Sequence, residues 1–162
     1  MTEAAEPDRD PTAISRFVER FAQLMIESGM PRIASRIFAA LLASGSGRLT
    51  ATELAEQLQA SAGAISGGVR YLTQLRMVAR EREPGSRRDH YRVGEDVWHQ
   101  MIAQQDQLMA RWVTSLREGT GVLGAKSPAG IRMAETVEFF EFFQKELQQV
   151  TQRWEAHRTG HQ

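Results

Sequence analysis

The sequence predicts a mainly α-helical chain that carries one small β-hairpin, and three observations lead to this fold class. Apolar side chains recur every three or four positions through most of the 162 residues, as on one face of a helix. Two short segments near the middle each begin with a helix-capping residue. The segment that follows them alternates apolar and polar residues and turns at a Pro-Gly pair.

The first two helices are expected on either side of a Gly and Pro break. Asp10 and Pro11 are typical of a helix start, with Asp as the N-cap and Pro in the first turn. Gly29 and Pro31 end this helix and begin the next, which the Ser-Gly-Ser-Gly run at 44–47 stops. The apolar stripe of the first helix is Ile14, Phe17, Phe21, Leu24 and Met25.

A helix-turn-helix and a hairpin are expected next. Thr50 and Glu53 match a capping box, in which a hydroxyl and a carboxylate satisfy the free N–H groups of a helix start. Ser61 is placed to cap a second short helix a few residues later, so a tight turn joins the two. Strands are then expected at 78–83 and 90–93, joined by the Pro-Gly-Ser turn.

Two further helices are expected in the C-terminal part of the chain. Asp96 is placed to cap a long helix, and Gly119 is expected to end it. Residues 119–130, rich in glycine, are expected to form a flexible connection. The last helix is expected to run from Ile131 to the mid-150s.

Composition excludes several classes of function. The chain has no cysteine, which excludes disulfides, thiolate metal sites and cysteine nucleophiles. No apolar run approaches the roughly 18 residues of a membrane span, and the acidic N-terminal residues do not resemble a secretory signal, so a cytoplasmic location is expected. Because no carboxylate pair, nucleophile triad or metal cluster has suitable spacing, we expect no enzyme activity, no cofactor and no metal.

Charge is unevenly distributed, and the cationic part coincides with the helix-turn-helix and hairpin. The chain has a net charge of zero, yet residues 61–94 hold seven arginines against three acidic residues. The first ten residues, in contrast, hold four acidic residues and one arginine. A cationic segment in a neutral chain indicates a local anionic partner.

The second helix of the pair starts with small residues. Between 61 and 68 only Ile65 is bulky, and its spacing directs it to the core. A helix that enters the major groove of DNA exposes small or polar residues there, although close packing between helices is the alternative reason for three glycines, each costing roughly 1 kcal/mol relative to alanine. We expect contact with DNA from Ser61, Ser66 and Arg70 in the helix and from Arg87 and Arg88 at the hairpin tip.

The stretch from residue 49 to residue 93 resembles the winged helix-turn-helix of the MarR family. Its Ser-Ala-Gly-Ala-Ile-Ser-Gly-Gly-Val-Arg-Tyr-Leu helix and Gly-Ser-Arg-Arg-Asp-His-Tyr-Arg-Val wing are most similar to the GbsR-like branch and to actinobacterial repressors of MmpL-type exporters. The resemblance implies a homodimeric, ligand-responsive transcription factor with a triangular α/β fold. It adds Ala62, Gly63 and Gly67 to the DNA-binding residues. Many MarR wings have an Asp-x-Arg pair, whereas here the acidic residue follows the two arginines, at Asp89.

The terminal helices are expected to form a dimer interface. The last helix has an apolar band too wide for the surface of one small domain, and a second chain would cover it. The alternative is burial against the first helix of the same chain. The expected interface residues are Phe139, Phe142, Phe143, Leu147 and Val150, with Trp154 on the same face and Phe140 well off it.

A second apolar set, spread over the first helix and the long helix after the wing, could line an effector cavity. If these two helices meet, as the resemblance suggests, their aromatic and methionine side chains enclose an apolar cleft, although such side chains also form ordinary cores. The set is Phe17, Phe21, Trp98, Met101 and Trp112.

Together these features predict a winged helix-turn-helix flanked by N- and C-terminal dimerisation helices. The expected parts are a disordered acidic tail (1–10), an N-terminal dimerisation helix (11–30), the DNA-binding domain (31–95), the C-terminal dimerisation helices (96–157) and a short tail (158–162). The predicted function is a homodimeric repressor that binds an inverted-repeat operator in double-stranded DNA, is released by a small apolar or amphipathic effector, and controls an exporter gene. The alternative is a winged-helix protein-interaction or scaffold module that does not bind DNA.

Overall fold

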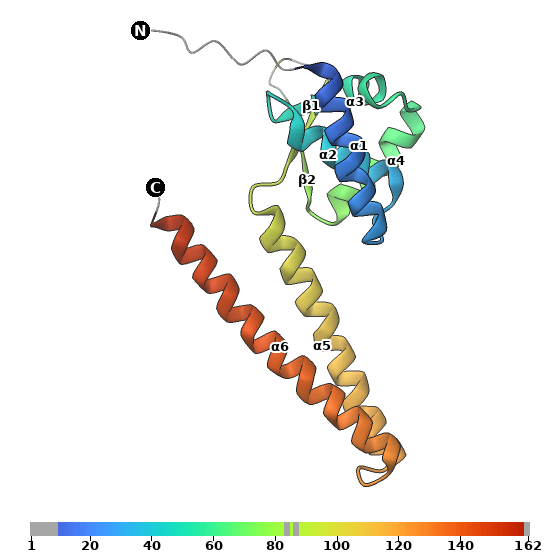
Figure 1. Ribbon diagram of the computed structural model, residues 1–162, viewed down its shortest axis with the longest axis vertical. Helices are drawn as coiled ribbons and strands as arrows, with labels where there is room; N and C mark the ends of the chain where they lie inside the picture. Colours follow the sequence, from blue (N-terminus) through green and yellow to red (C-terminus); the bar gives the residue numbers. More distant parts are fainter. Residues whose placement is uncertain (1–9, 83–84, 86–87, 161–162) are drawn as a thin grey trace. The chain divides into compact units, whose positions relative to one another are not determined.

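The chain divides after Gln100 into two compact units. The computed structural model describes residues 10–82, 85 and 88–160, and Figure 1 shows their helices and strands in chain order. The elements of the first unit are α1 (Pro11–Glu27), α2 (Arg32–Ala43), β1 (Arg48–Thr50), α3 (Ala51–Leu58), α4 (Ala62–Gln74), β2 (Val78–Arg82) and β3 (Asp89–Val93). α5 (Val97–Leu123) begins in this unit and continues into the second, which also contains α6 (Pro128–Thr159).

Side-chain caps start α1, α3 and α4 where the sequence predicts them. The Asp10 carboxylate accepts a hydrogen bond from the Thr12 N–H at 2.9 Å, and α1 ends before Gly29, whose φ is +95°. Thr50 and Glu53 form both bonds of the capping box at the start of α3. The Ser61 hydroxyl accepts from the Ala64 N–H at 3.2 Å and so caps α4. The predicted helix-turn-helix is therefore confirmed.

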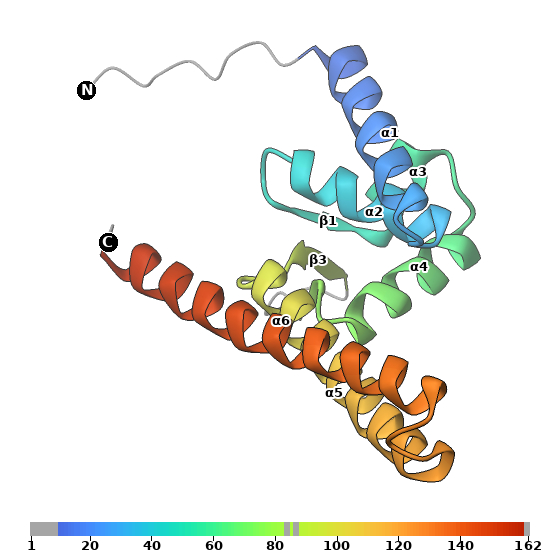
Figure 2. The same cartoon turned by 60° about the horizontal axis from the view of Figure 1, so that its bottom comes forward.

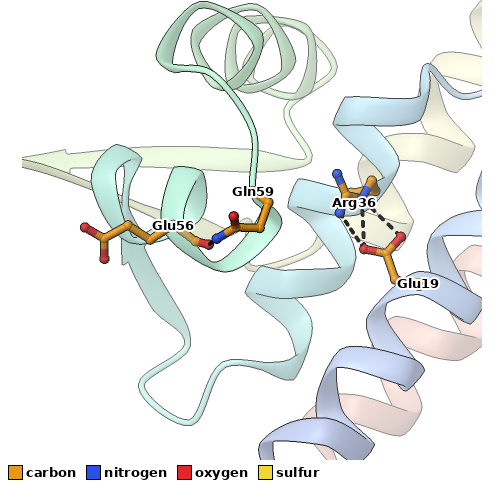
Figure 3. Close-up of polar contacts among 4 residues, drawn as sticks. All are labelled: Glu19, Arg36, Glu56 and Gln59. Atoms are coloured by element: carbon orange, nitrogen blue, oxygen red, sulfur yellow. Dashed lines mark hydrogen bonds and ion pairs between the residues drawn. The ribbon is translucent and has the colours of Figure 1, made fainter.

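The core of the first unit is built around α2. Ala34, Ile37, Phe38 and Leu41 are buried on this helix, and α1, α3 and α4 all pack against it. Burial of each large side chain contributes roughly 1.5–3 kcal/mol, so α2 is the scaffold that holds α4 in place. An ion pair adds a polar link between α1 and α2, in which the Arg36 guanidinium donates to both carboxylate oxygens of Glu19 at 2.6–3.1 Å (Figure 3).

The sheet has three antiparallel strands in the order β1-β3-β2, one more than the predicted hairpin. β1 lies between the Gly47 turn, with φ +68°, and the cap of α3, and it pairs Leu49 with Tyr91 of β3. On the other side of β3, Arg80 of β2 is the register partner of Tyr91. β2 and β3 extend beyond β1 and form the wing, which is joined to the end of α4 by residues 75–77.

In the second unit, α5 and α6 are joined by residues 124–127, which form a much shorter connection than the predicted one. Gly119 does not end the helix, so the prediction of a flexible segment over 119–130 is wrong. Gly119 lies inside α5, where a Cβ would lie 2.7 Å from the sulfur of the flexible Met133 side chain of α6. Gly124, with φ +84°, makes the turn, and the Ser127 hydroxyl caps α6 by accepting from the Gly130 N–H at 3.0 Å.

α5 and α6 run antiparallel from the turn that joins them (Figures 1 and 2). A small number of side chains hold the two helices together. Met109, Val113 and Val137 are buried, and the rings of Trp112 and Phe140 meet edge to face at 5.7 Å. The Gln144 amide donates to the Asp106 carboxylate at 3.0 Å, and Arg117 forms an ion pair with Glu141. In the part of the chain that the structure describes, no helix is long and apolar enough to cross a membrane.

Candidate nucleic-acid interface

The exposed face of α4 brings the predicted helical residues together. Ile65, Val69 and Leu72 point into the core, which turns the opposite face of the helix to solvent. Thr73 and Gln74 are exposed on the same face one turn further on, as the 3.6-residue helical repeat requires, and the sequence analysis missed them. All six predicted residues are exposed: Ser61, Ala62, Gly63, Ser66, Gly67 and Arg70.

The three glycines of α4 have different surroundings. At Gly68 a Cβ would lie 2.6 Å from Cδ1 of Ile37 and 3.2 Å from Cγ2 of Ile33, so this glycine allows α4 to pack closely on α2. At Gly63 and Gly67 a Cβ would have no atom within 4 Å. Packing between helices therefore explains one glycine and leaves the two exposed ones without a reason inside the fold.

The wing carries exposed arginines on β2 in addition to those predicted at the hairpin tip. Arg87 lies outside the described residues, and Arg88 is exposed. On β2, Arg80 and Arg82 are also exposed, at alternate positions on one face of the strand. Neither was among the DNA-binding residues predicted from the sequence. The signal that could have found them is the two-residue period of a strand, which places both arginines on the face that starts with the buried Val78.

Asp89, the displaced acidic residue of the wing, pairs with Arg80 across the hairpin. The hydrogen bond from Arg80 lowers the pKa of the Asp89 carboxyl, and the same bond raises the pKa of the Arg80 guanidinium. The positive charges of Arg82 and His90 also favour the ionised carboxylate. The wing therefore contains an ion pair that joins its two strands.

At the base of the wing, the capping box joins β1 to α3. The Glu53 carboxylate accepts from the Thr50 N–H at 2.7 Å and from the Thr50 hydroxyl at 2.9 Å, and these bonds lower the pKa of Glu53. His90, the register partner of Thr50, has a buried Nδ1 without a hydrogen-bond partner among the described atoms. Glu53 thus fixes the start of the helix that precedes α4.

The five predicted effector residues make separate contacts. Phe17 and Phe21 stack at 5.9 Å on α1 and line a hollow of about 450 Å³ with Arg20, Gln23 and Leu24. Trp98 meets the ring of Phe38 edge to face at 5.9 Å, whereas Trp112 contacts Phe140. The hollow is thus lined by two of the five residues, Phe17 and Phe21.

The predicted interface residues on α6 face away from α5, apart from one. Phe139, Phe142 and Phe143 are 60%, 65% and 44% exposed, and Val150 is also exposed, while Leu147 is half-buried. Phe140 lies off this face, as predicted, and contacts Trp112 of α5. The outward residues form an apolar band along α6, defined here as Phe139, Phe142, Phe143, Val150 and Trp154.

The capped helix-turn-helix and the three-stranded sheet define a winged helix-turn-helix protein, and comparisons with known proteins identify its family. A model of the MarR family matches residues 28–89, and a model of MmpR5-like MarR family transcriptional regulators matches residues 96–157. The chain belongs to the MarR family of transcriptional regulators. It is therefore a regulator and not an enzyme, and the predicted MarR resemblance is confirmed; neither model is described as GbsR-like, so that branch stays a prediction.

Comparisons with individual proteins give three further likenesses, of which the first two agree with this assignment. The chain is 27% identical over 157 residues to the HTH-type transcriptional regulator MmpR5 of Mycobacterium tuberculosis, a match that covers 96% of this chain and 92% of the relative. A crystal structure of a transcriptional regulator superposes with a TM-score of 0.76 at 25% identity, covering 89% of this chain and 99% of the other. A mutant of MepR from a multidrug-resistant S. aureus clinical isolate gives a TM-score of 0.42 at 14% identity, covering 82% and 94%.

Proposed function

We propose that this regulator binds double-stranded DNA as a homodimer, with α4 in the major groove and the wing on the adjacent backbone or minor groove. The DNA-binding residues are those predicted on α4, together with Arg87 and Arg88. A two-fold dimer presents two such helices, so the operator is an inverted repeat whose half-sites lie about one helical turn, roughly 34 Å, apart.

The observation that carries the proposal is the open space at Gly63 and Gly67. Gly67 lies in the interior of α4, where glycine costs about 0.8–1.0 kcal/mol relative to alanine, and nothing inside the fold requires glycine there. Gly63 lies in the first turn of the same helix and is equally open. An external partner that approaches the backbone of α4 supplies the reason. The groove of DNA fits, because the same face adds serine hydroxyls and Arg70 for phosphates or base edges.

Dimerisation is supported by the small core of the second unit. Its buried apolar side chains are Met109, Val113 and Val137, whereas ten large apolar side chains in its described residues are exposed. Two helices with so few buried contacts gain little stability by themselves. A second copy that packs against the apolar band of α6 would bury its aromatic rings and complete the core.

Release by a small apolar or amphipathic effector is the third part of the proposal. The apolar hollow on α1, whose lining includes two stacked phenylalanine rings, is the candidate site for such a ligand. A ligand lowers affinity for DNA only if it binds more tightly to the DNA-incompetent state. Control of an exporter gene rests on the family resemblance alone, and a cytoplasmic location rests on the sequence; both stay predictions.

A salt titration tests DNA binding against the alternative of a protein-interaction module. The probe is a duplex enriched by the wild-type protein from a random-sequence library, with a scrambled duplex as reference. Affinity should fall steeply as salt rises, because phosphate contacts release counterions. Ser66→Glu should abolish specific binding and leave the melting curve unchanged, since Ser66 is exposed. Failure of the wild type to bind any duplex would favour the protein-interaction alternative.

A further inference from the structure

The ion pair between Arg80 and Asp89 holds an exposed arginine in one orientation. The side chain of Arg80 is 61% exposed, whereas that of Asp89 is only 21% exposed, so the carboxylate is recessed and the guanidinium projects into solvent. In the strand register, Asp89 lies opposite Arg82, and Arg80 lies opposite Tyr91. The ion pair between Arg80 and Asp89 therefore crosses the hairpin diagonally. Both side chains therefore lie on one face of the wing.

Stability is a weak explanation for such a pair. Exposed ion pairs contribute about 0–1 kcal/mol, since solvent screens the attraction and two side chains lose rotational freedom. The backbone of β2 and β3 is already paired through five successive residues from Val78 to Arg82. What the pair does achieve is to restrict a long cationic side chain before any ligand arrives, which lowers the entropy lost on binding.

The surrounding charge indicates an anionic ligand. Arg82 lies on the same face of β2, opposite Asp89 in the register, so the described residues of this face include two arginines and one carboxylate. Arg88, immediately before Asp89, adds another exposed cation at the start of β3. This group lies on the strand that follows α4 after only three residues, on the same compact unit as the exposed face of α4.

We propose that Arg80 is a DNA-contacting residue of the wing and that Asp89 is its positioning residue. The inference rests on the proposed function, because it assigns one more contact to the same DNA interface. In the bound state Arg80 places its outward N–H groups on a phosphate, while its contact with Asp89 keeps the guanidinium oriented. Asp89 itself does not touch DNA.

Four proteins and one control test the assignment on the selected duplex. They are the wild type, Arg80→Gln, Asp89→Ala and the double variant, and the control is Glu19→Gln. The control removes the carboxylate of another surface arginine pair, between α1 and α2 (Figure 3). Affinity is measured by fluorescence anisotropy from 50 to 300 mM salt (roughly the range over which counterion release is resolved), and melting curves confirm that each variant is folded.

Arg80→Gln should reduce the slope of log K against log salt by about 1, the value for one phosphate contact. Asp89→Ala should weaken binding about 2- to 12-fold through lost orientation, and it should have no effect when added to Arg80→Gln. Glu19→Gln should leave affinity unchanged.

An unchanged salt slope in Arg80→Gln would overturn the contact. Tighter binding by Asp89→Ala, or an equal loss in both backgrounds, would overturn the positioning role. Because these outcomes are measured in a wild type that binds, they are distinct from a failure of the proposed function, in which the wild type itself binds no duplex.

Discussion

Gly67→Ala is expected to make the protein more stable and to weaken its binding to DNA at the same time. Gly67 lies inside α4, where alanine is more favourable by about 0.8–1.0 kcal/mol. No atom lies within 4 Å of the position that the new Cβ would occupy, so no clash offsets this gain. The free energy of unfolding should rise by up to about 1 kcal/mol, which raises Tm by roughly 2–4 °C for a chain of this size.

The loss in DNA affinity follows from the same methyl group. If the backbone of α4 lies against the groove, one added carbon at a close-packed contact costs about 1–3 kcal/mol. A dimer carries the substitution in both half-sites, so affinity should fall at least about tenfold, the factor that corresponds to 1.4 kcal/mol. Opposite signs for stability and binding exclude partial unfolding as the cause.

Thermal melting and anisotropy titration of the same preparations measure the two effects. Gly68→Ala is the matched control, because its Cβ would lie 2.6 Å from the Ile37 side chain in the core and should destabilise the protein. Gly67→Ala with higher stability and unchanged DNA affinity would refute close approach of DNA to this face. A fall in stability would show instead that Gly67 has a structural role in the fold.

Four other outcomes are expected. Phe142→Asp should break the dimer, as measured by sedimentation, because it places a charge in the apolar band of α6. The control Gln148→Asp, on the polar side of the same helix, should leave the dimer intact. A stable Phe142→Asp dimer would place the interface elsewhere. Glu53→Gln should lower stability at neutral pH by about 0.3–1 kcal/mol, because it removes a negative charge from the start of α3. Since folding lowers the pKa of Glu53, this difference should be complete above the unfolded pKa of about 4.3 and vanish as pH falls through the lowered folded pKa; a difference that persists in acid would contradict the assignment. Arg87→Ala combined with Arg88→Ala should reduce the salt slope by about 1–2 units, and an unchanged slope would remove the wing tip from the interface. Apolar amphiphiles should change tryptophan fluorescence and lower operator affinity about 5- to 150-fold together; a change in fluorescence alone would leave a binding site without a regulatory role.

Local hydrogen bonding explains why most helix starts could be predicted. Asp10, Thr50 and Ser61 each bond to an N–H two or three residues along the chain, so the relevant information lies within four residues of sequence. The strand β1 could not be found in this way. It has only three residues, and it exists because β3, some forty residues later, offers a free edge.

The end of α5 was predicted wrongly for a similar reason. Glycine in sequence indicates a helix end, yet Gly119 lies inside α5, beside the Met133 side chain of α6. The glycines of α4 show, within the candidate site, the same limit on what can be predicted from sequence alone. Gly67 and Gly68 are neighbours in sequence, and only the packing of α2 distinguishes the glycine that the fold requires from the one it does not.

The measurement that tests the central claim most directly is selection from a random duplex library by the 162-residue chain. We expect enrichment of an inverted repeat whose half-site centres are about 10–10.5 base pairs apart, as two recognition helices on one face of DNA require. Enrichment should disappear with Ser66→Glu. A library that remains random after selection by a folded wild-type protein, or one enriched for a single unrepeated site, would contradict the account.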